Sequence, residues 1–322
     1  MKHSFPQLNR RAMLKLVSVA GAATACRVRL SGQAANQTPA VKAIAAYLET
    51  LARPDGGYGW GDSEISHLTP TLGVVGSYRL LGQTPPRQTA LAQYLRRSHP
   101  REIKKLEQER RIFDYQQVQA LAWLGADLTE FSPKIAALTK PLAYLKQYER
   151  HGYPVFQSEL GVVMSHALLG LPTAGIAESF GGYIEVRRRS NGSFNNTPAT
   201  DGGDGHVMNT LRALQALPVL GREVDRKEEL IAWLRTCQLP GGGFTHAPKP
   251  EFGGVDDLAY TRAALRALSV RGAGPTNRPA CIAQIHTLAN ADGGFGDRAG
   301  WLSNATATYY ALDALAALGA ID

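Results

Sequence analysis

The chain is 322 residues long and has a formal net charge of +8 at pH 7, from 35 Lys and Arg against 27 Asp and Glu. Six of the basic residues lie in residues 1–35, which contain no Asp or Glu, so residues 36–322 carry 29 basic and 27 acidic side chains. This balance gives no electrostatic reason to expect nucleic acid or an anionic membrane as a partner. The later apolar stretches are too short for a transmembrane helix, so we expect no transmembrane segment.

The first 35 residues have the layout of an export signal. A pair of arginines at 10–11 precedes a short apolar run at 16–25 and then small residues, as in twin-arginine signal peptides. We therefore expect residues 1–35 to direct export to the periplasm or the cell exterior, and residues 36–322 to form the domain. Two alternatives remain open, an ordinary amphipathic first helix and a lipid anchor at Cys26, which follows a degraded lipoprotein box.

After the leader, the sequence repeats a short signature in which an aliphatic residue is followed by glycine. Glycine just past a helix supplies the left-handed conformation of a C-cap at low cost. Successive glycines are 43, 45, 51, 51 and 47 residues apart, a period typical of stacked supersecondary units. They are Gly82, Gly125, Gly170, Gly221, Gly272 (which follows an arginine instead) and Gly319.

Each unit contains two helical patterns, an amphipathic helix followed by one that is apolar or small nearly all round. A helix of the second kind must be covered on several sides, so it belongs to an inner layer. The outer and inner ranges pair as 41–52 with 68–81, 88–98 with 114–124, 135–149 with 157–169, 176–188 with 206–220, 226–237 with 256–270, and 279–289 with 305–318. The pattern predicts an all-α fold, a single (α/α)6 toroid of six helix pairs, with an open solenoid as the alternative.

A glycine-aromatic turn separates the outer from the inner helix in four of the units. It reads Asp55-Gly56-Gly57-Tyr58, Asn191-Gly192-Ser193-Phe194, Gly241-Gly242-Gly243-Phe244 and Asp292-Gly293-Gly294-Phe295. Glycine permits a tight reversal, and the aromatic ring can pack back between neighbouring units. The turns lack the preceding strand and the terminal Gly-Lys-Ser/Thr of a phosphate loop, so we do not expect them to bind nucleotides.

Two inner segments follow such turns with a recurring pattern, Asp256-Asp257-Leu258-Ala259-Tyr260-Thr261 and Ala305-Thr306-Ala307-Thr308-Tyr309-Tyr310-Ala311-Leu312. Together with the turns, they resemble the repeat of the prenyltransferase/squalene oxidase (squalene cyclase) family. The likeness covers most of residues 41–320 and is weakest around 100–160. It implies an α/α toroid, in agreement with the helix count, but a shared fold does not by itself carry an activity across.

The resemblance implies two kinds of chemistry. Protein prenyltransferases hold zinc through an Asp, a Cys two residues later and a His on the next repeat; the corresponding positions are Asp257, Ala259 and one near Ala307. With two of three ligands missing, we expect no metal, no cofactor and no zinc-dependent prenylation. Squalene-cyclase-like enzymes use Asp-x-Asp-Asp-Thr-Ala, of which Asp256 and Asp257 keep the adjacent aspartates. Either one would act as a general acid, or both simply cap the helix.

In a toroid, the N-terminal ends of the inner helices meet at one rim of the central cavity, where positive helix ends favour an acidic or polar ligand group. Besides the two aspartates, the polar residues expected to bind a ligand there are His67, Asp114, Tyr115, Glu159, Asp204, His206, Tyr260, Asn304 and Thr306. Among them, His206, Asp204 and Glu159 would form either a metal or acid–base cluster or a hydrogen-bonded structural network.

Two functions remain open. The main prediction is an exported toroid that binds an unidentified ligand (lipid-like, peptide or glycan) in its cavity or at its rim. The alternative is an isoprenoid or terpene cyclase-like enzyme with Asp256 or Asp257 as its general acid. Cys237 and Cys281 would form a disulfide in an oxidising compartment or remain buried thiols.

Overall fold

The computed structural model of the chain describes residues 39–98, 107–143, 155–248 and 256–321. The predicted leader at 1–35, which includes Cys26, lies outside these residues, so export and lipid attachment stay predictions. Within the described ranges, no helix is both long and apolar enough to cross a membrane.

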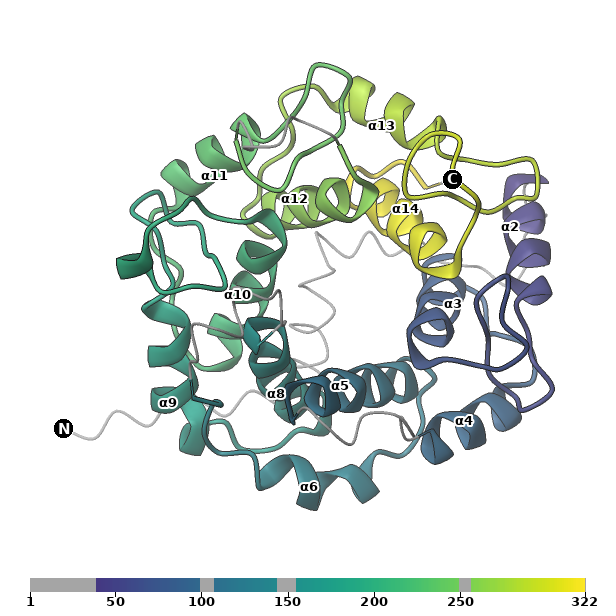
Figure 1. The fold of residues 1–322 in the computed structure, drawn as a ribbon, viewed down its shortest axis with the longest axis horizontal. Helices are drawn as coiled ribbons and strands as arrows, with labels where there is room; N and C mark the ends of the chain where they lie inside the picture. Colours follow the sequence, from purple (N-terminus) through teal and green to yellow (C-terminus); the bar gives the residue numbers. More distant parts are fainter. Residues whose placement is uncertain (1–38, 99–106, 144–154, 249–255, 322) are drawn as a thin grey trace, which may run out of the picture.

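Six of the helices that the structure describes form an inner layer around the centre of the molecule (Figure 1). In chain order they are α3 (Leu68–Leu80), α5 (Glu107–Trp123), α8 (Val155–Leu169), α10 (Val207–Val219), α12 (Leu258–Val270) and α14 (Ala305–Ala317). Each packs on the next, and α14 packs on α3, so the layer closes into a ring. Such packing requires apolar or small side chains on both flanks of each helix, as the sequence pattern indicates.

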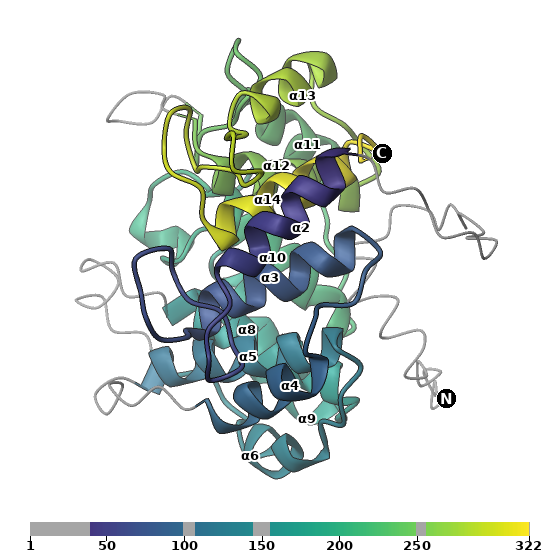
Figure 2. The same cartoon turned by 90° about the vertical axis from the view of Figure 1, so that its right-hand side faces the viewer.

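Six further helices of the described ranges lie around this ring. They are α2 (Pro39–Thr50), α4 (Gln88–Arg97), α6 (Ser132–Ala136), α9 (Ala174–Glu185), α11 (Lys227–Thr236) and α13 (Arg278–His286). Figure 2 shows α2 and α4 on the side of the ring that carries α3. The described residues form helices and isolated β-bridges, and they contain no β-strand longer than such a bridge. The predicted all-helical toroid is confirmed, and the twelve described α-helices are consistent with six pairs.

Two predicted helix boundaries are wrong. The outer helix expected at 135–149 ends at Ala136; residues 137–143 are not helical, and the remainder lies outside the described residues. Pro141 is one reason, since a proline disfavours helical backbone at the residue before it. The inner helix expected from residue 114 begins at Glu107, where Glu107 and Arg111 pair one turn apart at 3.6 Å and support the additional turns.

The four glycine-aromatic turns share one set of contacts. In each, the aromatic side chain is buried, its residue forms an isolated β-bridge to a residue just after the outer helix, and its backbone N–H donates to a threonine of the inner helix. The pairs, with the N to Oγ1 distance, are Tyr58 and Thr71 (3.0 Å), Phe194 and Thr210 (3.0 Å), Phe244 and Thr261 (3.0 Å), and Phe295 and Thr308 (3.1 Å). Each threonine is the fourth residue of its helix and is fully buried, so the contact fixes the inner helix against the turn.

These turns also pack against the next outer helix through a glycine with a positive φ. A Cβ on Gly56 (φ +95°) would lie 2.9 Å from the carbonyl oxygen of Ala90 in α4. Gly293 (φ +90°) in the last turn meets Ala43 of α2, the first described helix, in the same way. The outer layer is therefore closed by the same kind of contact that joins its successive units.

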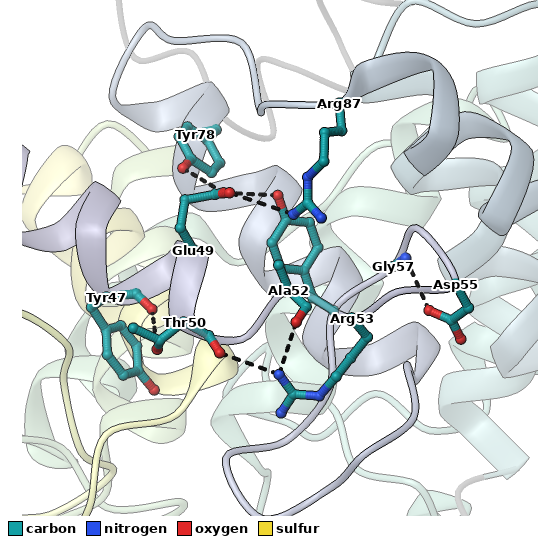
Figure 3. Close-up of polar contacts among 10 residues, drawn as sticks. Tyr47, Glu49, Thr50, Ala52, Arg53, Asp55, Gly57, Tyr78 and Arg87 are labelled. Atoms are coloured by element: carbon teal, nitrogen blue, oxygen red, sulfur yellow. Dashed lines mark hydrogen bonds and ion pairs between the residues drawn. The ribbon is translucent and has the colours of Figure 1, made fainter.

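Polar contacts near the first turn connect α2 to its neighbours (Figure 3). Glu49 accepts hydrogen bonds from the phenols of Tyr58 at 3.0 Å and Tyr78 at 2.9 Å, and it lies 3.4 Å from Arg87. Burial, reinforced by the Glu49 carboxylate, raises the pKa of both phenols, so both remain protonated donors. The network holds α2, its turn and α3 together.

Cys237 and Cys281 are buried free thiols, so the alternative of a disulfide does not hold. The Cys281 thiol donates to the carbonyl of Gly242 at 2.9 Å. Burial raises the pKa of both thiols to about 12, which keeps them protonated and unreactive near neutral pH.

Candidate functional site

A cavity with a volume of ≈ 160 Å³ lies inside the ring, and residues of all six inner helices line it. Its apolar lining consists of Leu72, Gly73, Ile112, Leu160, Gly161, Met164, Met208, Leu211 and Ala263. Its polar and aromatic lining consists of Thr69, Tyr115, Gln116, Gln119, Gln157, Arg212, Gln215, Arg262, Thr306, Tyr309 and Tyr310. Among the described residues that line it there is no Asp or Glu.

One pair of adjacent positions in every inner helix lines this cavity. The pairs are Leu72-Gly73, Tyr115-Gln116, Leu160-Gly161, Leu211-Arg212, Arg262-Ala263 and Tyr309-Tyr310. Each pair stands ten and nine residues before the glycine that ends its unit, so the lining follows the spacing of those glycines. In the four units with a glycine-aromatic turn, the pair comes directly after the anchoring threonine. The threonine faces the turn, and the next two side chains therefore face the centre.

A buried group of charged residues, Arg262, Arg266 and Asp313, lies beside the cavity. Arg262 Nε donates to Asp313 Oδ2 at 2.6 Å, and Arg266 donates to the other carboxylate oxygen. Burial by itself raises the pKa of Asp313, but the charges and hydrogen bonds of the two arginines together outweigh it and lower the pKa. Asp313 is therefore ionised, and its single charge is shared by two guanidiniums.

Arg262 also contacts the aromatic part of the lining. Its guanidinium carbon lies 5.4 Å from the ring centroid of Tyr309 and 4.9 Å from that of Tyr310. Burial raises the pKa of Tyr309 to about 12, so its phenol stays protonated at neutral pH. The tyrosine faces thus stabilise the arginine by cation–π attraction.

Arg212 of α10 forms no ion pair with any carboxylate in the described residues. Its Nη1 donates to the side-chain oxygen of Asn209 at 3.3 Å, and its side chain lines the cavity together with Arg262. Burial, with a further contribution from the charge of Arg262, lowers the pKa of Arg212 to about 10. The side chain is still charged at neutral pH, so the cavity wall carries positive charge that the described acidic residues do not balance.

Three aromatic rings cluster at the N-terminal ends of α10 and α12. The ring centroid of His206 lies 5.3 Å from that of His246 and 5.5 Å from that of Tyr260. His206 Nδ1 accepts a hydrogen bond from the backbone N–H of Met208 at 3.2 Å and so caps α10. Burial lowers the pKa of His206 to about 3, with smaller contributions from His246 and Arg212. His206 is therefore neutral and too weak a base to accept a proton near neutral pH.

Of the predicted ligand-binding residues, Tyr115 and Thr306 line the cavity, and the others do not. Asp114 pairs with Lys134 of α6 at 2.6 Å. The ring of His67 lies 3.2 Å from the hydroxyl of Ser63, outside the lining. Asn304 caps α14 by accepting a backbone N–H with its side-chain oxygen. Of these three side chains, only that of Asn304 caps a helix end.

The expected cluster of His206, Asp204 and Glu159 does not form, because each carboxylate has another partner. Asp204 accepts from the indole N–H of Trp233 at 3.0 Å, and Glu159 lies 2.5 Å from Arg111. Burial raises the pKa of Glu159, although the charge of Arg111 opposes the shift. In the described part of the chain, no group of three or more His, Cys, Asp and Glu is placed to hold a metal ion.

Asp256 and Asp257 lie at the start of α12, outside the cavity lining. Asp257 caps the helix, since its Oδ1 accepts from the Ala259 N–H at 2.9 Å, and its Oδ2 lies 3.5 Å from Arg298. Asp256 Oδ2 accepts from the side chain of Gln284 in α13 at 3.0 Å. A catalytic role for either aspartate stays a prediction.

The sequence prediction misses Arg212, Arg262, Tyr309 and Tyr310, because it places the site at the helix N-termini and the cavity lies about one turn deeper. A signal for them was available. A charged residue inside a helix that must be covered on several sides calls for a partner or a function, and Arg212 and Arg262 stand nine and ten residues before their terminal glycines.

The chain is similar to proteins of known structure. One similar solved structure is a variant of the type II terpene cyclase MstE from Scytonema in complex with the substrate geranylgeranyl dihydroxybenzoate. Its TM-score is 0.56 and its sequence identity is 14%, and the match covers 88% of this chain and 97% of that one. Another MstE variant, in complex with the product merosterolic acid A, has a TM-score of 0.53 and 14% identity over 87% of this chain and 95% of that one. At such low identity, the likeness shows the fold alone. No curated protein matches the chain.

A family model, the prenyltransferase alpha-alpha toroid domain, matches residues 24–120 and 88–322. The match includes all the inner helices and the turns that anchor them. The closed ring of the structure agrees with the architecture in the name of that model. The chain therefore belongs to the prenyltransferase alpha-alpha toroid family.

Proposed function

We propose that the protein binds an isoprenoid chain in its central cavity, as a terpene-cyclase-like toroid. The lining carries the proposal, since aliphatic and methionine side chains and three tyrosine rings converge there from the inner helices. Burying a hydrocarbon chain against such a wall contributes roughly 0.8 kcal/mol for each CH₂.

The similar structures support the same class of ligand. MstE forms complexes with geranylgeranyl dihydroxybenzoate as its substrate and with merosterolic acid A as its product. Because both compounds occupy a protein of this fold, an isoprenoid is favoured over the peptide and glycan ligands that the sequence left open.

Cyclisation with Asp256 or Asp257 as the general acid is the catalytic form of this proposal. A general acid must come within hydrogen-bonding reach of the atom that it protonates. Both carboxylates are bonded at the start of α12, and the described lining has no carboxyl group of its own. This geometry favours binding over proton-initiated cyclisation, so product formation is tested separately from binding.

Binding is tested by calorimetric titration of the full chain with geranylgeraniol. We expect saturable binding that Leu72→Trp weakens at least about tenfold, because the larger ring fills the cavity. Leu302→Trp makes the same exchange at a leucine that is 90% exposed and should leave affinity unchanged. Absence of binding by the wild type, or equal binding by a folded Leu72→Trp variant, would overturn the proposal.

The catalytic form is tested by incubation with geranylgeraniol and squalene, followed by mass spectrometry of extracted products. If Asp256 or Asp257 is the acid, products form and are lost in Asp256→Asn or Asp257→Asn. Binding without any product would leave a binding protein and reject the cyclase.

A further inference from the structure

Arg212 is an anomaly in the cavity wall because its neighbours do not neutralise it. The other side chains of α10 that line the cavity are Met208, Leu211 and Gln215, none of which carries a charge. Its one hydrogen bond to a described residue goes to the neutral amide of Asn209 at 3.3 Å. The remaining N–H groups of a planar, five-donor guanidinium are left for whatever fills the cavity.

The adjacent part of the wall, on α12, adds to this positive charge. Arg262 and Arg266 share the single carboxylate of Asp313, so with Arg212 there are three guanidiniums and one carboxylate. Burying a charge without a counter-charge is costly. An anion in the cavity would remove that cost.

Neutral donors surround the same space. Gln119, Gln157 and Gln215 line the cavity, and their side-chain amides form no hydrogen bond with any described residue. A glutamine amide offers two N–H donors that can complete the coordination of an anion.

We infer that the cavity receives a ligand with an acidic head, a carboxylate or a phosphate, which Arg212 and Arg262 bind while an apolar tail packs against the aliphatic and aromatic lining. The tail rests on the proposed function; the head rests on the unbalanced arginines. Guanidinium groups suit this role, since their parallel N–H groups match the oxygens of carboxylates and phosphates.

The test compares ligands that share one tail and differ in the head. The full chain is titrated calorimetrically near neutral pH with geranylgeraniol, geranylgeranoic acid, geranylgeranyl monophosphate and inorganic phosphate. The acid or the monophosphate should bind at least about tenfold more tightly than the alcohol, and whichever binds better identifies the head. Arg212→Gln should reduce this preference to within about twofold, whereas Arg212→Lys, which keeps the charge, should retain most of it.

Arg235→Gln is the matched control, because Arg235 lies on the outer helix α11, away from the cavity. It should bind all four probes like the wild type. Equal affinity for alcohol, acid and monophosphate would overturn the acidic head and leave the proposed function intact. If no prenyl compound binds but inorganic phosphate does, in a manner that depends on Arg212, the proposed function fails and the anion site stands. Binding of none of the four probes would reject both.

Discussion

The charge balance of the cavity wall depends on a single side chain, Asp313. It is 6% exposed and accepts hydrogen bonds from Arg262 and Arg266. Its removal would leave two neighbouring guanidiniums in a buried setting with no described acidic group between them. Breaking a buried ion pair in this way is far more harmful than losing an exposed one.

Asp313→Asn is expected to lower the free energy of unfolding by about 3–5 kcal/mol near neutral pH. Burial by itself raises the pKa of Asp313, but the two arginines outweigh burial and lower this pKa in the folded protein. The stabilisation is therefore complete above the pKa of an unfolded aspartate, about 3.9, and is lost as the pH falls through the folded pKa. Urea unfolding near neutral pH and in acid measures it, with the exposed Asp62→Asn as control. A difference from the wild type that does not shrink in acid would contradict an ionised pair.

Capping residues show how far the sequence can be read locally. Asp257, His206 and Asn304 are placed correctly at helix starts, because a cap depends only on residues two or three positions away. The sequence does not show that their side chains bond the helix ends rather than a ligand in the cavity. That depends on the rotation of each helix about its axis, which contacts beyond the cap determine.

The turn–threonine contact determines this rotation in four units. In the fifth unit, the oxygen of Thr261 accepts the backbone N–H of Phe244 at 3.0 Å, and both residues are fully buried. A buried N–H without an acceptor costs about 1–3 kcal/mol. The contact therefore fixes the inner helix against the turn. It also fixes the direction in which the following cavity pair points.

Thr261→Val keeps the shape of the side chain but leaves the Phe244 N–H unpaired, so we expect a loss of about 1–3 kcal/mol in urea unfolding. Thr261→Ser keeps the acceptor and should lose clearly less. The same threonine-to-valine change at the exposed Thr287 should have little effect. If serine at 261 is as harmful as valine, packing of the methyl group and not the hydrogen bond is responsible.

Closure of the ring involves both layers. In the inner layer, a Cβ on Gly73 of α3 would lie 2.7 Å from the carbonyl oxygen of Ala305 in α14, so the two helices approach closely because this residue is glycine. In the outer layer, Gly293 meets Ala43 of α2. The first and last described units thus hold each other at two depths.

Gly293→Ala would place a Cβ against the Ala43 carbonyl, on a backbone with φ of +90°. The left-handed conformation alone costs a non-glycine residue about 1–2 kcal/mol, and the clash adds to it. Hydrogen–deuterium exchange should therefore quicken first in α2 and around the last turn. Gly274→Ala, whose Cβ would meet nothing within 4 Å, is the control. If exchange becomes faster to the same extent in all helices, the junction between the first and last units is no less stable than the rest of the ring.

The architecture could be predicted further than the site. Periodic glycines and helical patterns establish the toroid because they are local signals repeated many times. The early end of α6 was missed because residues 137–143 continue an amphipathic spacing, although their backbone is not helical and Pro141 disfavours a helix there. The arginines of the cavity became recognisable as a group only once α10 and α12 were placed beside each other.

A chain of stacked repeats can be lengthened at its ends, but here every inner helix already has a neighbour on both sides. Inserting a seventh unit would require a change in the angle between every two adjacent inner helices. The number of units thus fixes the width of the central space for the whole molecule. A larger or smaller ligand is therefore accommodated by changing the size of the side chains in the cavity-lining pairs. In these pairs, Gly73 and Gly161 are already the smallest possible residue.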